Sequence, residues 1–338
     1  MQLPRLALTL TVALLGAFLF DFLHIPMPWL LGPLFFILFA RLVTPLPIQW
    51  PKHMKDIGLV LAGYSIGVAF QLDAFANMGR FFPLMIGSNV FYIILFVVMS
   101  RWIARRTKVD QLAALTSTVP GGMSQIVAYA AEKGSQHMTM ITFYQVLRVL
   151  CILSIVPLIV TSQSTTPPIN TATYTPTLFM LLLASYGAGY LAQRVHIPTG
   201  YMLGPVILII AVQLLPITIA VPHLPASALH IAQLFIGMFI GMLLKREDLH
   251  LSKKVIFYAF VSAGIYIASA YGLAILVADW YDIQFKTAFL SIMPGGLDQM
   301  SLIAASVHAD VTLVTAFQLF RVLVVVLIVV PGLKYFTK

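Results

Sequence analysis

Pro120-Gly121-Gly122-Met123-Ser124-Gln125 interrupts an apolar segment that is otherwise long enough to cross a membrane. A closely similar stretch, Pro294-Gly295-Gly296-Leu297-Asp298-Gln299, follows in the second half of the chain. Proline and glycine both disfavour a continuous helix, because proline lacks an amide hydrogen and glycine loses the most backbone freedom on folding. We interpret the two stretches as paired breaks in membrane helices, and we expect a site around them.

The composition is that of a membrane protein. The 338-residue chain is 60% hydrophobic and 9% charged, whereas a soluble domain carries roughly 25% charged residues. Apolar runs of about 20 residues recur, and each can cross a hydrocarbon core of roughly 30 Å. We therefore predict an all-α polytopic membrane protein with the lipid bilayer as its main partner. No soluble segment is long enough for a DNA-reading module, so direct nucleic-acid binding is not expected.

Each half of the chain predicts about five full spans and one interrupted segment. In the first half the spans cover about residues 6–23, 29–43, 57–72, 82–102 and 138–160, and the interrupted segment covers about 110–133. Each arm of the interrupted segment has roughly ten residues, which as helix is half a bilayer. We expect one membrane repeat over residues 1–160, a Ser/Thr/Pro-rich external linker over 161–176, and a second repeat over 177–338.

Four blocks recur in the same order and at a nearly constant spacing, which indicates an internal duplication. The blocks begin at these pairs: His24 and His196, Gly63 and Gly237, Ser117 and Ser291, Gln145 and Gln318. Gly63 and Gly67, with their counterparts Gly237 and Gly241, form small-xxx-small faces on which helix backbones can approach closely.

Basic residues in the loops predict the orientation of the halves, since they favour the cytoplasmic side. If each interrupted segment enters and leaves on one side, nearly every basic loop and both termini lie in the cytoplasm, and the uncharged linker lies outside. The halves then form two inverted-topology repeats. If the interrupted segments instead crossed fully, the halves would be parallel, and the basic loop around Lys253 and Lys254 would face outside.

Interrupted helices in inverted repeats are typical of secondary transporters, where the breaks expose backbone groups near the midplane. A helix restarts after each Pro-Gly-Gly, and its free N–H groups can face an anion. The alternative is a structural kink sealed by neighbouring helices. The candidate binding residues at the breaks are Ser117, Thr118, Gly121, Gly122, Ser124, Gln125, Ser291, Gly295, Gly296, Asp298 and Gln299.

Two arginines lie near the middle of predicted spans. Arg148 and Arg321 each follow a glutamine by three positions, Gln145 and Gln318, so each Gln and Arg share one helical face. A buried guanidinium usually faces the bundle interior or a wet cavity, and it binds carboxylates in two-pronged fashion. It can equally bind the carbonyl groups of the break and fix it in place. Both roles are compatible.

Asp298 breaks the symmetry of the two halves, because its counterpart is Ser124. A carboxylate at this depth can pair with Arg321, bind a proton or sodium as coupling ion, or cap the restarted helix. The residues contain no metal-ligand spacing, phosphate-binding loop or nucleophile motif, so no cofactor, metal site or enzymatic activity is expected.

Pro28-Trp29-Leu30-Leu31-Gly32-Pro33 and the two Pro-Gly-Gly-x-x-Gln motifs resemble the bacterial AbrB-duplication membrane protein family, over nearly the whole chain. The resemblance implies a bacterial inner-membrane protein in a family that is described as regulating gene expression, with an ammonia monooxygenase label on some members. A small DNA-binding regulator shares the family's name, but this chain does not resemble it.

The residues favour a secondary transporter for a small anionic or carboxylate-bearing solute, bound at the two breaks. A membrane-embedded regulator is the second hypothesis, acting through a partner or through a transported metabolite. An integral membrane enzyme is the third, and no metal-binding pattern supports it. The sequence leaves the solute, the coupling ion, the direction of transport and the oligomeric state open.

Overall fold

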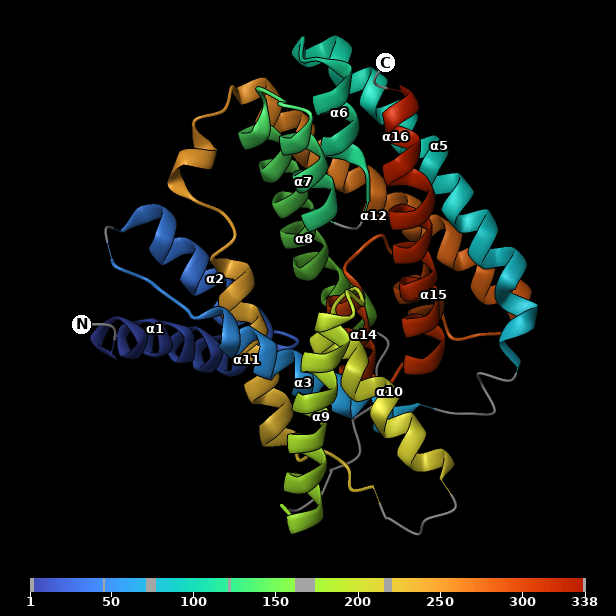
Figure 1. The fold of residues 1–338 in the computed structure, drawn as a ribbon. Helices are drawn as coiled ribbons and strands as arrows, with labels where there is room; N and C mark the ends of the chain where they lie inside the picture. Colours follow the sequence, from blue (N-terminus) through green and yellow to red (C-terminus); the bar gives the residue numbers. More distant parts are fainter. Residues whose placement is uncertain are drawn as a thin grey trace. The chain divides into compact units, whose positions relative to one another are not determined.

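The computed structural model describes residues 3–44, 46–70, 77–120, 123–161, 174–215 and 221–336. These residues form helices and loops without a strand (Figure 1), so the predicted all-α class is confirmed. Five helical stretches are long and apolar enough to cross a membrane: Arg5–Phe22, Met78–Thr107, Met138–Thr161, Lys253–Tyr281 and Val311–Leu333. Pro28–Val43, Gly200–Leu214 and Ala226–Gly241 are apolar but shorter. Five full crossings in each half therefore remain a prediction.

The chain folds into two compact units, and each unit takes segments from both halves of the sequence. Unit 1 comprises Met1–Gln71, Pro157–Lys245 and Ser301–Thr312, and unit 2 comprises Leu72–Val156, Arg246–Met300 and Leu313–Lys338. The predicted linker lies mostly outside the described residues, at 162–173. The compact units thus divide the chain differently from the two repeats, which remain a prediction from the sequence.

Unit 1 is built from three helices of each half: α1 (Leu3–Phe22), α2 (Pro28–Val43), α3 (Lys52–Ala69), α9 (Pro176–Arg194), α10 (Gly200–Leu214) and α11 (Ala226–Gly241). Glycines let these helices meet backbone to backbone. A Cβ on Gly63 of α3 would overlap the carbonyl oxygen of Met202 in α10, and a Cβ on Gly237 of α11 would overlap that of Leu30 in α2. The close approach expected at these glycines is confirmed.

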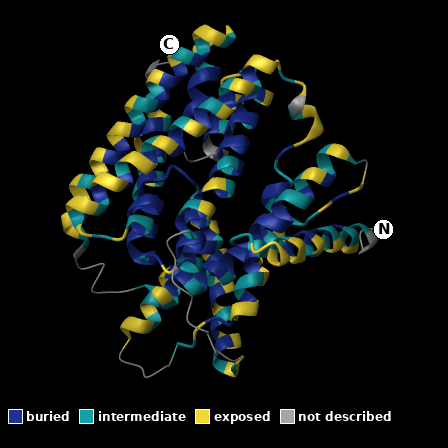
Figure 2. Cartoon of the chain, turned by 180° about the vertical axis from the view of Figure 1, so that it is seen from behind, coloured by how far each residue is buried: buried dark blue, intermediate teal, exposed yellow. Residues whose placement is uncertain are grey.

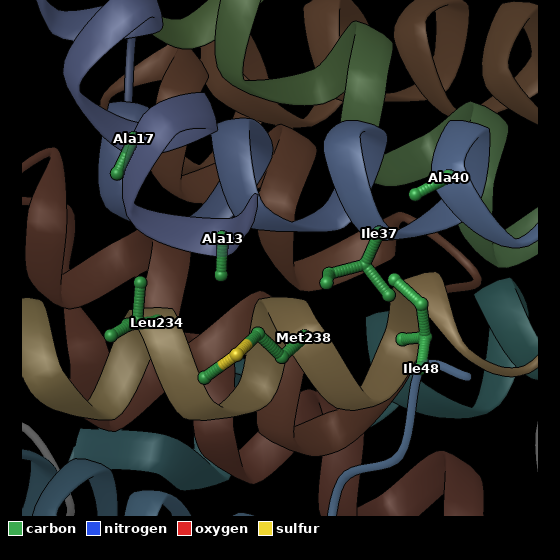
Figure 3. Close-up of a cluster of buried hydrophobic side chains, with 7 residues drawn as sticks. All are labelled: Ala13, Ala17, Ile37, Ala40, Ile48, Leu234 and Met238. Atoms are coloured by element: carbon green, nitrogen blue, oxygen red, sulfur yellow. The ribbon is translucent and has the colours of Figure 1, made fainter. Parts of the chain in front are cut away.

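A cluster of buried apolar side chains joins α1, α2 and α11 (Figure 3). It consists of Ala13, Ala17, Ile37, Ala40, Ile48, Leu234 and Met238. Small alanines on α1 and α2 leave room for the longer side chains of α11, so the three helices interdigitate. This cluster holds α11, from the second half of the chain, against the first two helices of the first half.

Unit 2 contains the two broken segments and the longest helices. Its elements are η1 (Asn77–Phe81), α5 (Phe82–Thr107), α6 (Gln111–Thr118), α7 (Met123–Glu132), α8 (Met138–Thr161, as far as Val156), η2 (Arg246–Leu249), α12 (Lys253–Tyr281), α13 (Phe285–Ile292), α14 (Leu297–Ser306, as far as Met300), α15 (Val311–Val324, from Leu313), the π-helical η3 (Val325–Val329) and α16 (Val330–Phe336).

The long helices α5 and α12 lie side by side and run in opposite directions (Figure 1). Three aromatic pairs establish this direction. Phe81 stacks on Tyr281 at 5.3 Å, Tyr92 lies 6.1 Å from Tyr266, and Trp102 meets Tyr258 at 4.8 Å, all between ring centroids. As the residue number rises along α5 it falls along α12. Both helices carry exposed apolar residues, among them Ile94 of α5 and Phe257 of α12. Exposed residues are coloured yellow in Figure 2.

Residues with left-handed backbone conformation occur in pairs along the described chain. The pairs are His24 and His196, Met27 and Thr199, Lys108 and Asp282, and Gly134 and His308. The members of each pair have nearly the same separation in sequence as the two Pro-Gly-Gly stretches. A positive φ is uncommon outside glycine. Corresponding turns of the two halves therefore share an unusual local conformation.

Candidate functional site

Both Pro-Gly-Gly stretches interrupt helices in the structure. α6 ends at Thr118 with Val119 as its C-cap, and α7 restarts at Met123. α13 ends at Ile292 with Met293 as its C-cap, and α14 restarts at Leu297. The last carbonyl groups of a helix have no partner within it, and at membrane depth water cannot supply one. The breaks therefore need polar side chains from elsewhere in the fold.

Gln145 and Arg148 of α8 supply the partners at the first break. The amide nitrogen Nε2 of Gln145 donates to the carbonyl oxygens of Thr116 at 2.7 Å, Ser117 at 3.5 Å and Val119 at 3.2 Å. Nη1 of Arg148 donates to the Val119 oxygen at 2.9 Å, and Nη2 donates to Oε1 of Gln145 at 2.7 Å.

Gln318 and Arg321 of α15 make the matching contacts at the second break. Nε2 of Gln318 donates to the carbonyl oxygens of Leu290 at 2.7 Å, Ser291 at 3.4 Å and Met293 at 3.1 Å. Arg321 donates through Nη1 to the oxygens of Ile292 at 3.4 Å and Met293 at 2.6 Å, and through Nη2 to Gly295 at 2.8 Å and to Oε1 of Gln318.

These contacts give the two arginines a structural role. Each arginine is almost fully buried and places its positive charge at the negative end of a half-helix, which is stabilising. Of the two compatible roles expected for the arginines, binding of the break carbonyls is the one found. Whether the same residues also bind a solute stays a prediction.

Two buried tyrosines of unit 2 each lie near the break that belongs to the other half of the chain. The hydroxyl of Tyr266, on α12, donates to the carbonyl oxygen of Thr118 at 2.6 Å and lies near Arg148. Tyr92, on α5, lies near Arg321. Its buried hydroxyl has no hydrogen bond of normal geometry, although Ser269 is close. Because the rings of Tyr92 and Tyr266 lie 6.1 Å apart between centroids, the polar groups around the two breaks form one polar centre.

The different hydrogen bonding of the Tyr266 and Tyr92 hydroxyls leads to a prediction. Removing the Tyr266 hydroxyl leaves the Thr118 carbonyl with one partner fewer, which costs about 1 kcal/mol. We therefore expect Tyr266→Phe to lower the midpoint of thermal unfolding of the detergent-purified protein by about 1–2 °C, and Tyr92→Phe to change it less. An equal or larger loss in Tyr92→Phe would contradict the asymmetry.

Several buried polar atoms around the breaks have no hydrogen-bond partner. They are Nε of Arg148 and of Arg321, Oγ of Ser117 and of Ser291, and Oε1 of Gln299. Most buried polar atoms are paired, so such orphans need an explanation. The predicted residue Thr118 is different, because its hydroxyl has the carbonyl oxygens of Ala114, Leu115 and Phe96 within hydrogen-bond distance and can donate to one of them.

The remaining predicted residues are placed unequally by the structure. Gly121 and Gly122 lie outside the described residues, as do the side chains of Ser124 and Gln125. Asp298 is buried in the first turn of α14. A Cβ on Gly296 would overlap the amide oxygen of Gln299, and a Cβ on Gly295 would lie 2.8 Å from the side chain of Met300. The Gly-Gly pair thus makes room for side chains of the restarted helix.

Comparison with known proteins agrees with the motifs that the chain carries. A family model described as "Transition state regulatory protein AbrB" matches residues 29–337. The chain belongs to this family. It is 24% identical to "Uncharacterized protein YhjN" of Bacillus subtilis over 95% of this chain and 90% of the relative. It is also 24% identical to "Putative regulator AbrB" of Escherichia coli, over 90% and 88% of the two chains. No solved structure matches significantly.

Sequence reasoning on this AbrB-family chain missed Tyr92 and Tyr266. An aromatic residue inside an apolar span reads as a packing residue, so neither tyrosine attracted attention. A usable signal was present, however, because the two tyrosines have the same separation in sequence as the two Pro-Gly-Gly stretches. Reading every polar residue at that offset would have found both.

Proposed function

We propose that this AbrB-family protein is a secondary transporter for a small anionic solute, such as an organic acid, which binds at the two breaks of unit 2. The buried charge of that unit carries the proposal. Among its described residues, the buried charged side chains are Arg148, Arg321 and Asp298. Two positive charges and one negative charge leave +1, or +2 if Asp298 is protonated.

The half-helix ends do not remove this excess. The C-terminal ends of α6 and α13 each contribute about −0.5 charge, and the N-terminal ends of α7 and α14 each contribute about +0.5, so the four ends cancel. An unbalanced charge in a medium of low dielectric constant is costly. A bound anion would offset this positive charge, so the buried residues favour a negatively charged solute.

The unpaired polar atoms support a binding role. Nε of each arginine and the hydroxyls of Ser117 and Ser291 are donors without acceptors, and a carboxylate accepts several such hydrogen bonds at once. These donors come in equivalent pairs from the two breaks. The solute would therefore contact both breaks, while the Nη groups of the arginines keep the half-helices in place.

An inverted duplication fits the recurring geometry. The Gln–Arg contacts, the left-handed turns and the glycine contacts of the first half all recur at corresponding positions of the second. The corresponding helices α5 and α12 run antiparallel, as inverted repeats require. Repeats of this kind with interrupted helices are the architecture in which secondary transporters bind substrate.

The proposal places the protein in the bacterial inner membrane with both termini in the cytoplasm, as the loop charges favour. Asp298 is the candidate for binding a coupling proton or sodium ion, because the other break has Ser124 at this position. Transport leaves the solute chemically unchanged, so the proposal includes no catalytic residue.

Serine variants test the binding role separately from stability. Ser117→Ala and Ser291→Ala remove hydroxyls that have no partner in the fold, so the midpoint of thermal unfolding should stay within about 2 °C. Loss of a hydrogen bond to a charged solute should weaken its binding roughly tenfold or more. A thermal-shift screen against small organic acids identifies the solute, and uptake into proteoliposomes then measures its transport.

Ser154→Ala is the matched control, because the Ser154 hydroxyl is satisfied by the carbonyl oxygen of Leu150 on α8 at 2.6 Å. It should leave solute affinity unchanged. Wild-type affinity for the solute in both Ser117→Ala and Ser291→Ala would show that these hydroxyls do not bind it. Absence of uptake or counterflow for every anion that stabilises the protein would overturn transport.

Regulation of gene expression is the second candidate, and the names of the family and of the Escherichia coli relative favour it. The chain would act through a partner protein or through a transported metabolite. Deleting the gene should then change transcript levels. If Ser117→Ala and Ser291→Ala abolish uptake but leave the transcripts normal, the regulatory role is independent of transport.

A further inference from the structure

A basic pocket lies in unit 2, where the end of α5 meets the beginning of α12. Its volume is about 330 Å³, and it is lined by Arg106, Lys253, Lys254, Phe257 and Tyr258. Arg106 comes from the last turn of α5, and the two lysines come from the first turn of α12. The pocket is far along both helices from the tyrosines Tyr92 and Tyr266, so it is separate from the candidate site at the breaks.

Lys253 and Lys254 lie at the N-terminal end of α12, where a positive charge is unfavourable. α12 begins after its N-cap Ser252, its first turn contains no acidic residue, and Lys253 and Lys254 occupy that turn. The N-terminal end of a helix carries about half a positive charge and favours anions. Within the described part of the chain, the three cations of the pocket form no ion pair. A bound anion would relieve this accumulation of positive charge.

The apolar residues of the pocket indicate what kind of anion fits. Phe257, one turn after the lysines, is 61% exposed. Tyr258 packs edge-on against Trp102, with ring centroids 4.8 Å apart. Tryptophan and tyrosine beside lysine and arginine are typical of the membrane–water interface. An exposed phenylalanine beside the cations suits a ligand with a charged head and an apolar tail.

We infer that this pocket binds the headgroup of an anionic phospholipid. The phosphate lies against Arg106, Lys253 and Lys254, and an acyl chain runs along Phe257. Basic pockets between membrane helices are known sites for such headgroups. The loop charges assign both basic segments to the cytoplasmic side, where the leaflet supplies anionic lipid. This site needs neither the breaks nor the transported solute, so it stands independently of the proposed function.

The test compares lipid binding by the full-length protein and by Lys253→Gln/Lys254→Gln. Delipidated protein in detergent is titrated with phosphatidylglycerol or with phosphatidylcholine, and native mass spectrometry measures the bound lipid. We expect wild-type protein to prefer phosphatidylglycerol. Each cation near a headgroup contributes roughly a fivefold gain in affinity, so the double variant should bind phosphatidylglycerol about 25-fold more weakly.

Lys52→Gln/Lys133→Gln is a charge-matched control, because both lysines are exposed and lie outside the pocket. It should retain wild-type affinity, as should Lys253→Arg/Lys254→Arg. Equal weakening in the control and the pocket variant would overturn the inference. So would equal binding of phosphatidylcholine, or displacement of phosphatidylglycerol by about 10 mM inorganic phosphate, since the pocket would then bind a soluble anion.

Discussion

Replacing Arg321 by methionine should lower the midpoint of thermal unfolding by about 5 °C. The guanidinium donates to the carbonyl oxygens of Met293 and Gly295 at 2.6 and 2.8 Å. Methionine removes these donors, and the buried oxygens at the end of α13 lose partners that water cannot replace. At about 1–3 kcal/mol for each unsatisfied group, the loss amounts to roughly 3–5 kcal/mol.

Two further variants separate charge from hydrogen bonding at this position. Arg321→Lys keeps the positive charge but lacks the forked donor geometry, so it should recover only part of the stability. Arg101→Met removes an exposed arginine of α5 and should change the midpoint little. An unchanged midpoint in Arg321→Met would mean that the break does not depend on this arginine.

Alanine at Gly63 or Gly237 should also destabilise the protein strongly. A Cβ at either position would overlap a backbone carbonyl oxygen of the neighbouring helix, that of Met202 or that of Leu30. A backbone atom cannot move aside as the end of a side chain can, so the helices must separate. The expected cost is about 3 kcal/mol for each variant, at the upper end for overpacking. Thermal unfolding in detergent measures it.

The same substitution elsewhere provides the control. A Cβ on Gly87 of α5 or Gly264 of α12 would meet no atom within 4 Å. Because alanine favours a helix over glycine by about 1 kcal/mol, Gly87→Ala and Gly264→Ala should leave the midpoint unchanged or raise it. Similar losses in all four variants would show that helix contact at Gly63 and Gly237 is not the cause.

Hydropathy was sufficient to find most helices, because apolar length decides whether a segment enters a membrane. α2 was expected from about residue 29 and begins at Pro28, and α8 was expected at about 138–160 and spans Met138–Thr161. The beginning of α3 was missed. It lies at Lys52 rather than near residue 57, since Lys52 and Lys55 are polar residues that a helix accepts readily but that end an apolar run.

The contacts of the site were only partly predictable. The spacing of Gln145 and Arg148 placed both side chains on one face, but sequence spacing does not reveal what that face meets. The carbonyl groups of Thr116 and Val119 become visible as acceptors only when α8 packs beside α6. Lys253 and Lys254 likewise indicated only the orientation of a loop from the sequence. Their pocket became visible only in the structure, where Arg106 at the end of α5 lies beside them.

The interleaving of the two units sets the order in which the protein can assemble. α5 to α8 leave the ribosome before α12 to α15, yet these helices together form unit 2. Gln145 and Arg148 can pair with the first break early, but Tyr266 reaches the Thr118 carbonyl only after most of the chain has been made. The early helices must therefore enter the bilayer before their partners in unit 2 exist, and the polar centre is completed late in biogenesis.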